Sequence, residues 1–270
     1  MKTRILAAAV LLPLLLLVVL AAPKIFTAIL FGAMAGIAAY ELLVGAKLVK
    51  NMRLCVYSIV SAFWCVLWSG LGIGNVWLLL GVLIFWIALF AEVMASNMKI
   101  PFVRIAACVV AGVILPLLFG SVVRIHSAEK GRFFILVPFA MAFSSDTGAY
   151  FAGLKFGKTK LAPTISPKKT VEGVVGGVVG AMLVMLIYCL VLQVFFGMKP
   201  NYLFALIYGL LGAGAGVFGD LCFSVIKRQN EIKDYGNLIP GHGGILDRFD
   251  SMMTVAPRVE ALLIIAPFAV

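Results

Sequence analysis

The sequence predicts an all-α, polytopic integral membrane helix bundle with about nine transmembrane helices. Hydrophobic residues make up 63% of the chain and charged residues only 12%, against about 45–50% and about 25% in an average soluble domain. The mean hydropathy is +1.13. Because a water-soluble core of this size could not bury so much apolar surface, we expect lipid to solvate most of the chain.

Nine apolar stretches approach the length of about 20 residues that a spanning helix needs. The first resembles a secretory signal, but its length favours a retained helix. So many helices leave no room for a soluble domain, so we expect one membrane-embedded domain over residues 1–270, with N-terminal helices in 1–132 and the active site in 133–270. The stretches are Ile5–Ala22, Ile25–Val44, Val56–Gly72, Trp77–Ala95, Phe102–Val122, Phe133–Leu154, Val174–Phe196, Tyr202–Ile226 and Ser251–Val270.

The placement of Lys and Arg predicts the orientation of these helices. With the N-terminus inside and alternating spans, the outer loops receive only Lys24, Arg124, Lys130, Arg132 and Lys199, and nearly all other basic residues face the inside. This bias follows the positive-inside rule. We therefore expect a multi-pass protein of the cell (inner) membrane whose N-terminus and active-site loops are cytoplasmic.

The net charge of +11 is then explained by loops that face anionic lipid. Nucleic-acid binding would need a basic stripe interleaved with exposed aromatic residues. No such stripe occurs, so we expect no nucleic-acid partner.

Among the acids within the apolar spans, four lie in the cytoplasmic half of their helix in this topology. An ionisable group at membrane depth is costly and by default a functional candidate. Glu41 and Glu92 are interpreted as carboxylates near a helix end that reach the interface. Asp146 and Asp220 are interpreted as functional.

The densest polar stretch, residues 224–250, combines three kinds of group. Its Lys and Arg side chains suit phosphate oxygens, and a Pro-Gly-His-Gly-Gly loop lets backbone amides approach an anion. Asp247 and Asp250, with Asp220 from the preceding helix, are hard oxygen ligands suited to Mg²⁺. Few carboxylates, many cations and a glycine loop indicate phosphoryl or nucleotidyl transfer. A loop that only fixes topology would explain the cations, but not the acids and the His-Gly-Gly as well.

This stretch resembles the signature of the phosphatidate cytidylyltransferases, or CDP-diacylglycerol synthases. The pattern is Ser-x-apolar-Lys-Arg, four residues, Lys-Asp, then His-Gly-Gly-apolar-x-Asp-Arg-apolar-Asp, and residues 224–250 match it without departure. The resemblance extends to the hydrophobic body of the chain, although only loosely before Phe133.

A second cluster is similar to the same family. Asp-Thr-Gly-Ala-Tyr occupies residues 146–150, and Ser-Pro-Lys-Lys-Thr-x-Glu-Gly occupies residues 166–173. We expect Ser166 to cap the seventh helix with Pro167 at its first position. Lys168 and Lys169 would then lie at a positive helix N-terminus, where a phosphate binds well. Both clusters fall on the inner side of the predicted topology, so we expect them to converge.

Glycines recur at spacings of three and four on the seventh and eighth spans. Small residues on one helix face let membrane helices pack backbone to backbone, so we interpret these glycines as packing residues. They are Gly173, Gly176, Gly177 and Gly180, and then Gly209, Gly212, Gly216 and Gly219.

The resemblance implies that CTP and phosphatidic acid give CDP-diacylglycerol and pyrophosphate. Our hypothesis from the residues is that Asp220 and Asp247 hold the catalytic metal, that Asp250 supports this site, and that the basic residues neutralise the phosphates. The implied catalytic set is Asp220, Lys227, Arg228, Lys233, Asp234, His242, Asp247, Arg248 and Asp250. The implied substrate-binding set is Asp146, Lys168, Lys169, Glu172, Ser224, Gly243 and Gly244. His242 is open to two roles, as proton donor or as a structural residue.

The expected cofactor is Mg²⁺, and the resemblance also implies a monovalent cation such as K⁺ and a homodimer. The expected partners are CTP, phosphatidic acid and the bilayer. The nearer alternative is another CTP-dependent lipid enzyme, such as a polyprenol or phytol kinase or a CDP-archaeol synthase. The farther alternative is a secondary transporter of an anionic solute, which broken helices with acids near the membrane midplane would favour. Here the acids lie toward one surface, which counts against alternating access.

Overall fold

The computed structural model describes residues 2–239, 241 and 243–269, and it confirms an all-α membrane architecture. Seven helices in this part of the chain are long and apolar enough to cross a bilayer. The chain divides into two compact units. Unit 1 comprises Met1–Glu129 with Gln229–Phe249, and unit 2 comprises Lys130–Arg228 with Asp250–Val270. Residues 229–249 group with the N-terminal helices, and the single domain expected over residues 1–270 stays a prediction.

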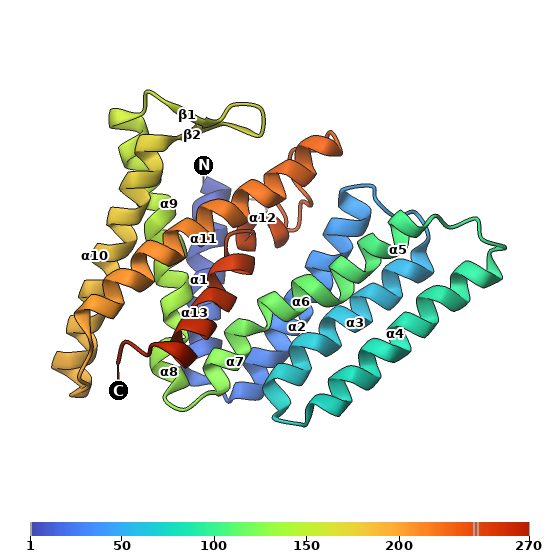
Figure 1. The fold of residues 1–270 in the computed structure, drawn as a ribbon, viewed down its shortest axis with the longest axis horizontal. Coiled ribbons are helices and arrows are strands. Elements are labelled where there is room, and N and C mark those ends of the chain that lie inside the picture. The colour runs from blue at the N-terminus through green and yellow to red at the C-terminus, as the bar shows by residue number, and fades with distance from the viewer. Residues whose placement is uncertain (1, 240, 242, 270) are drawn as a thin grey trace. The chain divides into compact units, whose positions relative to one another are not determined.

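Unit 1 consists of helices joined by short loops (Figure 1). Two of them contain a π-helical turn, and the last is a short helix near the end of the signature segment, residues 224–250. The elements are α1 (Lys2–Ala21), α2 (Lys24–Tyr40), η1 (Glu41–Gly45), α3 (Met52–Leu71), α4 (Asn75–Ala95), α5 (Phe102–Val109), η2 (Val110–Ile114), α6 (Leu115–Phe119), α7 (Ser121–Ser127) and α12 (Leu246–Phe249).

The core of unit 1 forms around α2, which packs against α3, α6 and α7. Phe31 of α2 lies 5.1 Å from Phe119 of α6, measured between ring centroids, and Phe119 lies 5.5 Å edge-on from Phe249 of α12. Aromatic burial of this kind fixes one element against another. These contacts anchor the end of the signature segment in the core of unit 1.

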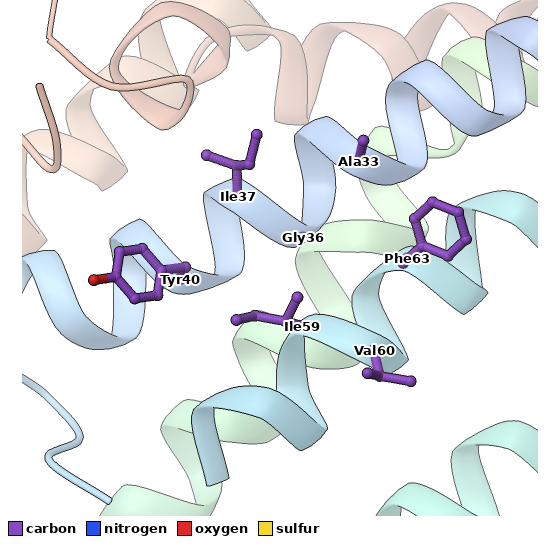
Figure 2. A pocket seen from close by; sticks show the side chains of 7 residues that line it. All are labelled: Ala33, Gly36, Ile37, Tyr40, Ile59, Val60 and Phe63. Atoms are coloured by element: carbon purple, nitrogen blue, oxygen red, sulfur yellow. The ribbon is translucent and has the colours of Figure 1, made fainter. Parts of the chain in front are cut away.

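An apolar groove of about 510 Å³ follows the surface between α2 and α3. Figure 2 shows the Tyr40 ring at one end and the Phe63 ring at the other, with Ile37 and Ile59 between them. No acidic or basic side chain lines the groove, so it offers nothing for phosphate chemistry.

Unit 2 contains two long antiparallel helices connected by a β-hairpin, followed by a third long helix and a short terminal one (Figure 1). The two strands pair antiparallel, with Lys160 opposite Thr170 and Ala162 opposite Ser166. The elements are α8 (Gly131–Phe134), α9 (Leu136–Phe156), β1 (Lys160–Ala162), β2 (Ser166–Thr170), α10 (Val171–Phe196), α11 (Tyr202–Gln229) and α13 (Met252–Ile265).

The glycine faces pack as the sequence predicted. A Cβ at Gly177 would lie 2.8 Å from the Ser145 carbonyl oxygen of α9. A Cβ at Gly180 would lie 2.9 Å from the Ser144 carbonyl oxygen. On α11, Gly209 lies against Met182 of α10, and a Cβ at Gly219 would lie 2.9 Å from the Asp250 carbonyl oxygen. These close approaches leave no room for larger side chains, so glycine is required where the helices meet.

The count of nine spans is not confirmed. The seven helices that qualify coincide with the second to eighth expected spans, and α1 coincides with the first. The ninth expected span, Ser251–Val270, contains only the 14-residue helix α13. That length is well short of the roughly 20 residues that a crossing needs.

The expected cap of the seventh helix is wrong. Ser166 begins strand β2, and α10 begins five positions later at Val171. Thr170 is the cap, because its side chain accepts a hydrogen bond of 3.1 Å from the Gly173 amide. Lys168 and Lys169 therefore lie on a strand, because pairing with β1 keeps this segment extended.

Candidate active site

An acid of α11 and a base of the hairpin form the centre of the charged cluster in unit 2. Lys169 pairs with the Asp220 carboxylate, and each side chain is about three-quarters shielded from solvent. The strand conformation of residues 166–170 directs Lys169 to this helix. Asp220 lies inside an apolar span, where a carboxylate needs a partner.

Asp250 is the second acid of this cluster. Its side chain is buried and accepts a hydrogen bond of 2.8 Å from the Ser251 amide. Burial, followed by the neighbouring Asp220 carboxylate, raises the pKa of Asp250 from its ordinary 3.8 to about 7. The positive charge of Lys227, two turns after Asp220 on α11, acts to lower the pKa of Asp250. Two adjacent carboxylates with nearby lysines form a site that suits a bound cation and a phosphate.

The close packing of α11 and α13 holds these two acids together. The Thr254 hydroxyl donates to the Ala215 carbonyl oxygen at 2.7 Å. Gly219, next to Asp220, lies against Thr254 and the Asp250 backbone. The glycine face of α11 therefore fixes the position of Asp250 beside Asp220.

Further contacts fix the hairpin. The Glu172 carboxylate accepts hydrogen bonds of 3.1 Å from the Lys158 and Thr159 amides, so it orders the base of the hairpin rather than pointing to a ligand. Arg228 at the end of α11 donates from Nε to the Ile165 carbonyl oxygen at 3.1 Å. The structure thus brings Ile165 and Lys169 of the hairpin against the end of α11 and Asp220. The convergence of the hairpin with residues 229–249 stays a prediction.

Asp247 organises the signature loop, defined as residues 230–245, within unit 1. Its side chain is buried, and Oδ2 accepts hydrogen bonds from the Tyr235 amide at 2.8 Å and the Gly244 amide at 3.0 Å. Gly243 has a φ of +87°, a left-handed conformation that favours glycine. Gly243 and Gly244 therefore lie against the Asp247 side chain.

The interpretation of Glu41 as a carboxylate that reaches the interface is wrong. Glu41 is 4% exposed, and it accepts hydrogen bonds from the Ile245 and Leu246 amides. Sequence reasoning missed this role, although an acid inside an apolar span was a sufficient signal. Glu92, by contrast, pairs at 3.6 Å with the exposed Arg53 and accepts a hydrogen bond from Asn51 near its helix end.

The other expected site residues fall into three groups. Ser224 is buried in α11. Lys168, Lys233, Asp234, Arg248 and Asp146 are exposed. His242 lies outside the described residues.

The expected metal pair is Asp220 with Asp247. The two residues belong to different units, and their sharing of one metal stays a prediction. Within the described part of the chain, no three His, Cys, Asp or Glu side chains gather as a metal site. Mg²⁺ needs only one or two carboxylates when a substrate supplies phosphate oxygens, so the Asp220–Asp250 pair fits such an ion.

Taken together, the apolar helices and the charged clusters define a multi-pass membrane protein equipped for phosphate chemistry. The profile of the Cytidylyltransferase family matches residues 2–266. The chain therefore belongs to this family, and the resemblance seen in the sequence is confirmed.

Several bacterial proteins named phosphatidate cytidylyltransferase are similar to the chain. The protein of Bacillus subtilis is 38% identical over 184 residues, which cover 66% of this chain and 67% of the relative. The protein of Staphylococcus epidermidis is 43% identical over 139 residues, 52% of each chain. That of Haemophilus influenzae is 39% identical over 132 residues, 49% of this chain and 46% of the relative. The matched stretch thus spans about half to two thirds of these relatives, and neither a lipid kinase nor a transporter is favoured.

Proposed function

We propose that this protein is a phosphatidate cytidylyltransferase, a nucleotidyltransferase that converts CTP and phosphatidic acid to CDP-diacylglycerol and pyrophosphate in phospholipid biosynthesis. Family membership and the names of the bacterial relatives support the proposal. The single observation in the structure that carries it is the pairing of Lys169 with Asp220 beside Asp250, because phosphate chemistry needs cations and metal-ligating acids together.

The reaction explains why the cluster contains more bases than acids. A phosphate oxygen of phosphatidate attacks the α-phosphorus of CTP, and the bond between this phosphorus and the oxygen bridging to the β-phosphate breaks. Pyrophosphate leaves with the electron pair. The nucleophile is already an anion, so no strong general base is needed. The enzyme must reduce repulsion between two polyanions and stabilise the leaving group. We assign these tasks to Lys168, Lys169, Lys227 and Arg228.

In this proposal Mg²⁺ is the cofactor, held by Asp220 and Asp250. Once bound, the ion would neutralise the triphosphate and polarise its phosphorus–oxygen bonds. The Lys169 ammonium on Asp220 supports this assignment, because that carboxylate already attracts a cation. Asp250 adds a second oxygen donor, and its raised pKa is typical of paired acids at functional sites. A monovalent cation and a homodimer remain part of the proposal on family resemblance alone.

The substrates also bear on which side of the membrane the active site lies. Phosphatidate keeps its acyl chains in the bilayer, so its headgroup meets water-soluble CTP at the interface. The excess of Lys and Arg in the loops assigned inside supports a cytoplasmic hairpin, signature loop and N-terminus, in the inner membrane.

Purified protein tests the activity directly. With CTP, Mg²⁺ and phosphatidate in mixed micelles, we expect CDP-diacylglycerol and pyrophosphate in equal amounts, and no product when EDTA replaces Mg²⁺. Absence of product with Mg²⁺ in a folded preparation would contradict the proposal. Product formation in EDTA would remove the metal from it.

A further inference from the structure

Glu41 lies at the end of α2, about two hundred positions before the loop that it contacts. Its Oε1 accepts a hydrogen bond of 3.0 Å from the Ile245 amide, and its Oε2 accepts one of 2.8 Å from the Leu246 amide. Both carboxylate oxygens are thus engaged by consecutive backbone amides. A buried carboxylate is retained only where such hydrogen bonds compensate for its desolvation.

Three glycines show how closely the signature loop approaches this region. A Cβ at Gly236 would lie 2.6 Å from Glu41 Oε1, and a Cβ at Gly244 would collide with the same carboxylate. A Cβ at Gly45, at the end of the π-helical turn that begins at Glu41, would collide with the Tyr235 carbonyl oxygen. The loop backbone therefore lies directly on the Glu41 side chain and the end of this helix.

The Glu41 contacts also determine where Asp247 lies. Ile245 and Leu246 immediately precede Asp247, whose own carboxylate accepts from the Tyr235 and Gly244 amides. Two buried acids thus hold Tyr235 and residues 244–246 through four backbone amides. If the Glu41 contacts were lost, residues 244–246 would no longer be fixed, and neither would the side chains of Asp247 and Arg248 that follow.

We propose that Glu41 is a positioning residue, which holds the signature loop and so sets the position of Asp247 and Arg248. Its effect on turnover rests on the proposed function. Its effect on the loop does not.

Hydrogen exchange on the full-length protein in detergent tests the proposal. Glu41→Gln keeps the shape of the side chain but turns one acceptor into a donor that faces a backbone amide. Losing one hydrogen bond to a buried charge should speed exchange of the signature-loop amides by about tenfold to a hundredfold. Exchange in α5 to α7 of the same unit should stay unchanged. Glu92→Gln is the matched control, because Glu92 is also an acid near the end of an apolar helix, but its carboxylate contacts Asn51 and Arg53.

Unchanged loop exchange in Glu41→Gln would overturn the proposal. If exchange rose throughout the protein, a second comparison separates loss of the Glu41 contact from general destabilisation. Gly236→Ala should speed loop exchange when Glu41 is present and should add nothing in Glu41→Ala, because the colliding carboxylate is gone. Equal effects of Gly236→Ala in both backgrounds would also overturn it.

Kinetics separate positioning from simple destabilisation. Glu41→Gln should lower kcat about tenfold or more and leave the KM for CTP within about twofold, as expected for misplaced catalytic groups. A normal kcat in spite of faster loop exchange would contradict the link to Asp247 and Arg248. If the unmodified protein made no CDP-diacylglycerol but Glu41→Gln still loosened the loop, the proposed function would fail and the positioning of the loop would stand.

Discussion

Lys169 on strand β2 pairs with Asp220 in helix α11, so the hairpin between two long helices supplies the cation for an acid inside a third. This pair lies beside Asp250, whose pKa is raised by burial and by Asp220. Lys169 therefore compensates one of two adjacent carboxylates, and Lys227 acts on the other. Loss of Lys169 would leave these acids facing each other with less compensation.

Lys169→Ala should reduce formation of CDP-diacylglycerol about a hundredfold, the size of effect seen when one preorganised charge-stabilising donor is removed. Lys160→Ala on β1 is the control, because Lys160 lies exposed on the same hairpin and should retain near-normal turnover. Steady-state rates with CTP and phosphatidate give the comparison. Equal rates in the two variants would remove Lys169 from the site.

Asp247→Asn separates the charge of Asp247 from its structural role. Both amide hydrogen bonds are accepted by the single oxygen Oδ2, so an Asn carbonyl oxygen in that position can keep them. We expect the loop to remain ordered and the protein to remain inserted, and turnover to fall by more than about a hundredfold.

Hydrogen exchange of the signature loop, measured beside the turnover assay, checks both halves of this prediction. Near-normal turnover would remove Asp247 from the catalytic set that the family signature implies. Loss of loop order would show that the carboxylate charge itself is needed for the fold.

Gly176→Ala should destabilise the α9–α10 pair. Its Cβ would collide with that of Ala152 and would lie 2.9 Å from the Gly148 carbonyl oxygen. Overpacking of this kind costs about 1–3 kcal/mol, so the melting temperature in detergent should fall by several degrees, at about 2–4 °C per kcal/mol. Gly214→Ala on α11 is the control, because nothing lies within 4 Å of its added Cβ. Equal melting temperatures would show that the helices do not need this close contact.

The proposed orientation predicts which loops an impermeant thiol reagent reaches. In a cysteine-free background, Thr164→Cys at the hairpin should be labelled only from the cytoplasmic side. Gly74→Cys, in the loop between α3 and α4, should be labelled only from outside. Both positions are exposed, and the added Cβ at Gly74 meets no neighbour. Labelling of both positions from the same side would contradict the alternating topology.

The membrane spans were predictable because the bilayer fixes both the length and the apolar character of a crossing helix. Seven expected spans therefore coincide with described helices that are long and apolar enough to cross a bilayer. The hairpin was not predictable in the same way, since Ser166 and Thr170 are both competent caps. Only the pairing of Lys160 with Thr170 decides between them.

The candidate site was predictable as a set of residues but not as a set of contacts. The motifs indicated Lys169, Asp220 and Asp250. They did not indicate that Glu172 orders the hairpin base, or that Glu41 lies beneath a loop about two hundred positions away. Contacts at such separations are fixed by the packing of helices, and local sequence carries little information about them.

The central claim is that this protein transfers the cytidylyl group of CTP to phosphatidate, and the fate of a labelled phosphate tests it most directly. Incubation with phosphatidate and CTP carrying label at the α-phosphorus should place the label in the lipid fraction, while label at the γ-phosphorus should be recovered in pyrophosphate. Label from the γ-position in the lipid, with none from the α-position, would identify a kinase and contradict the account.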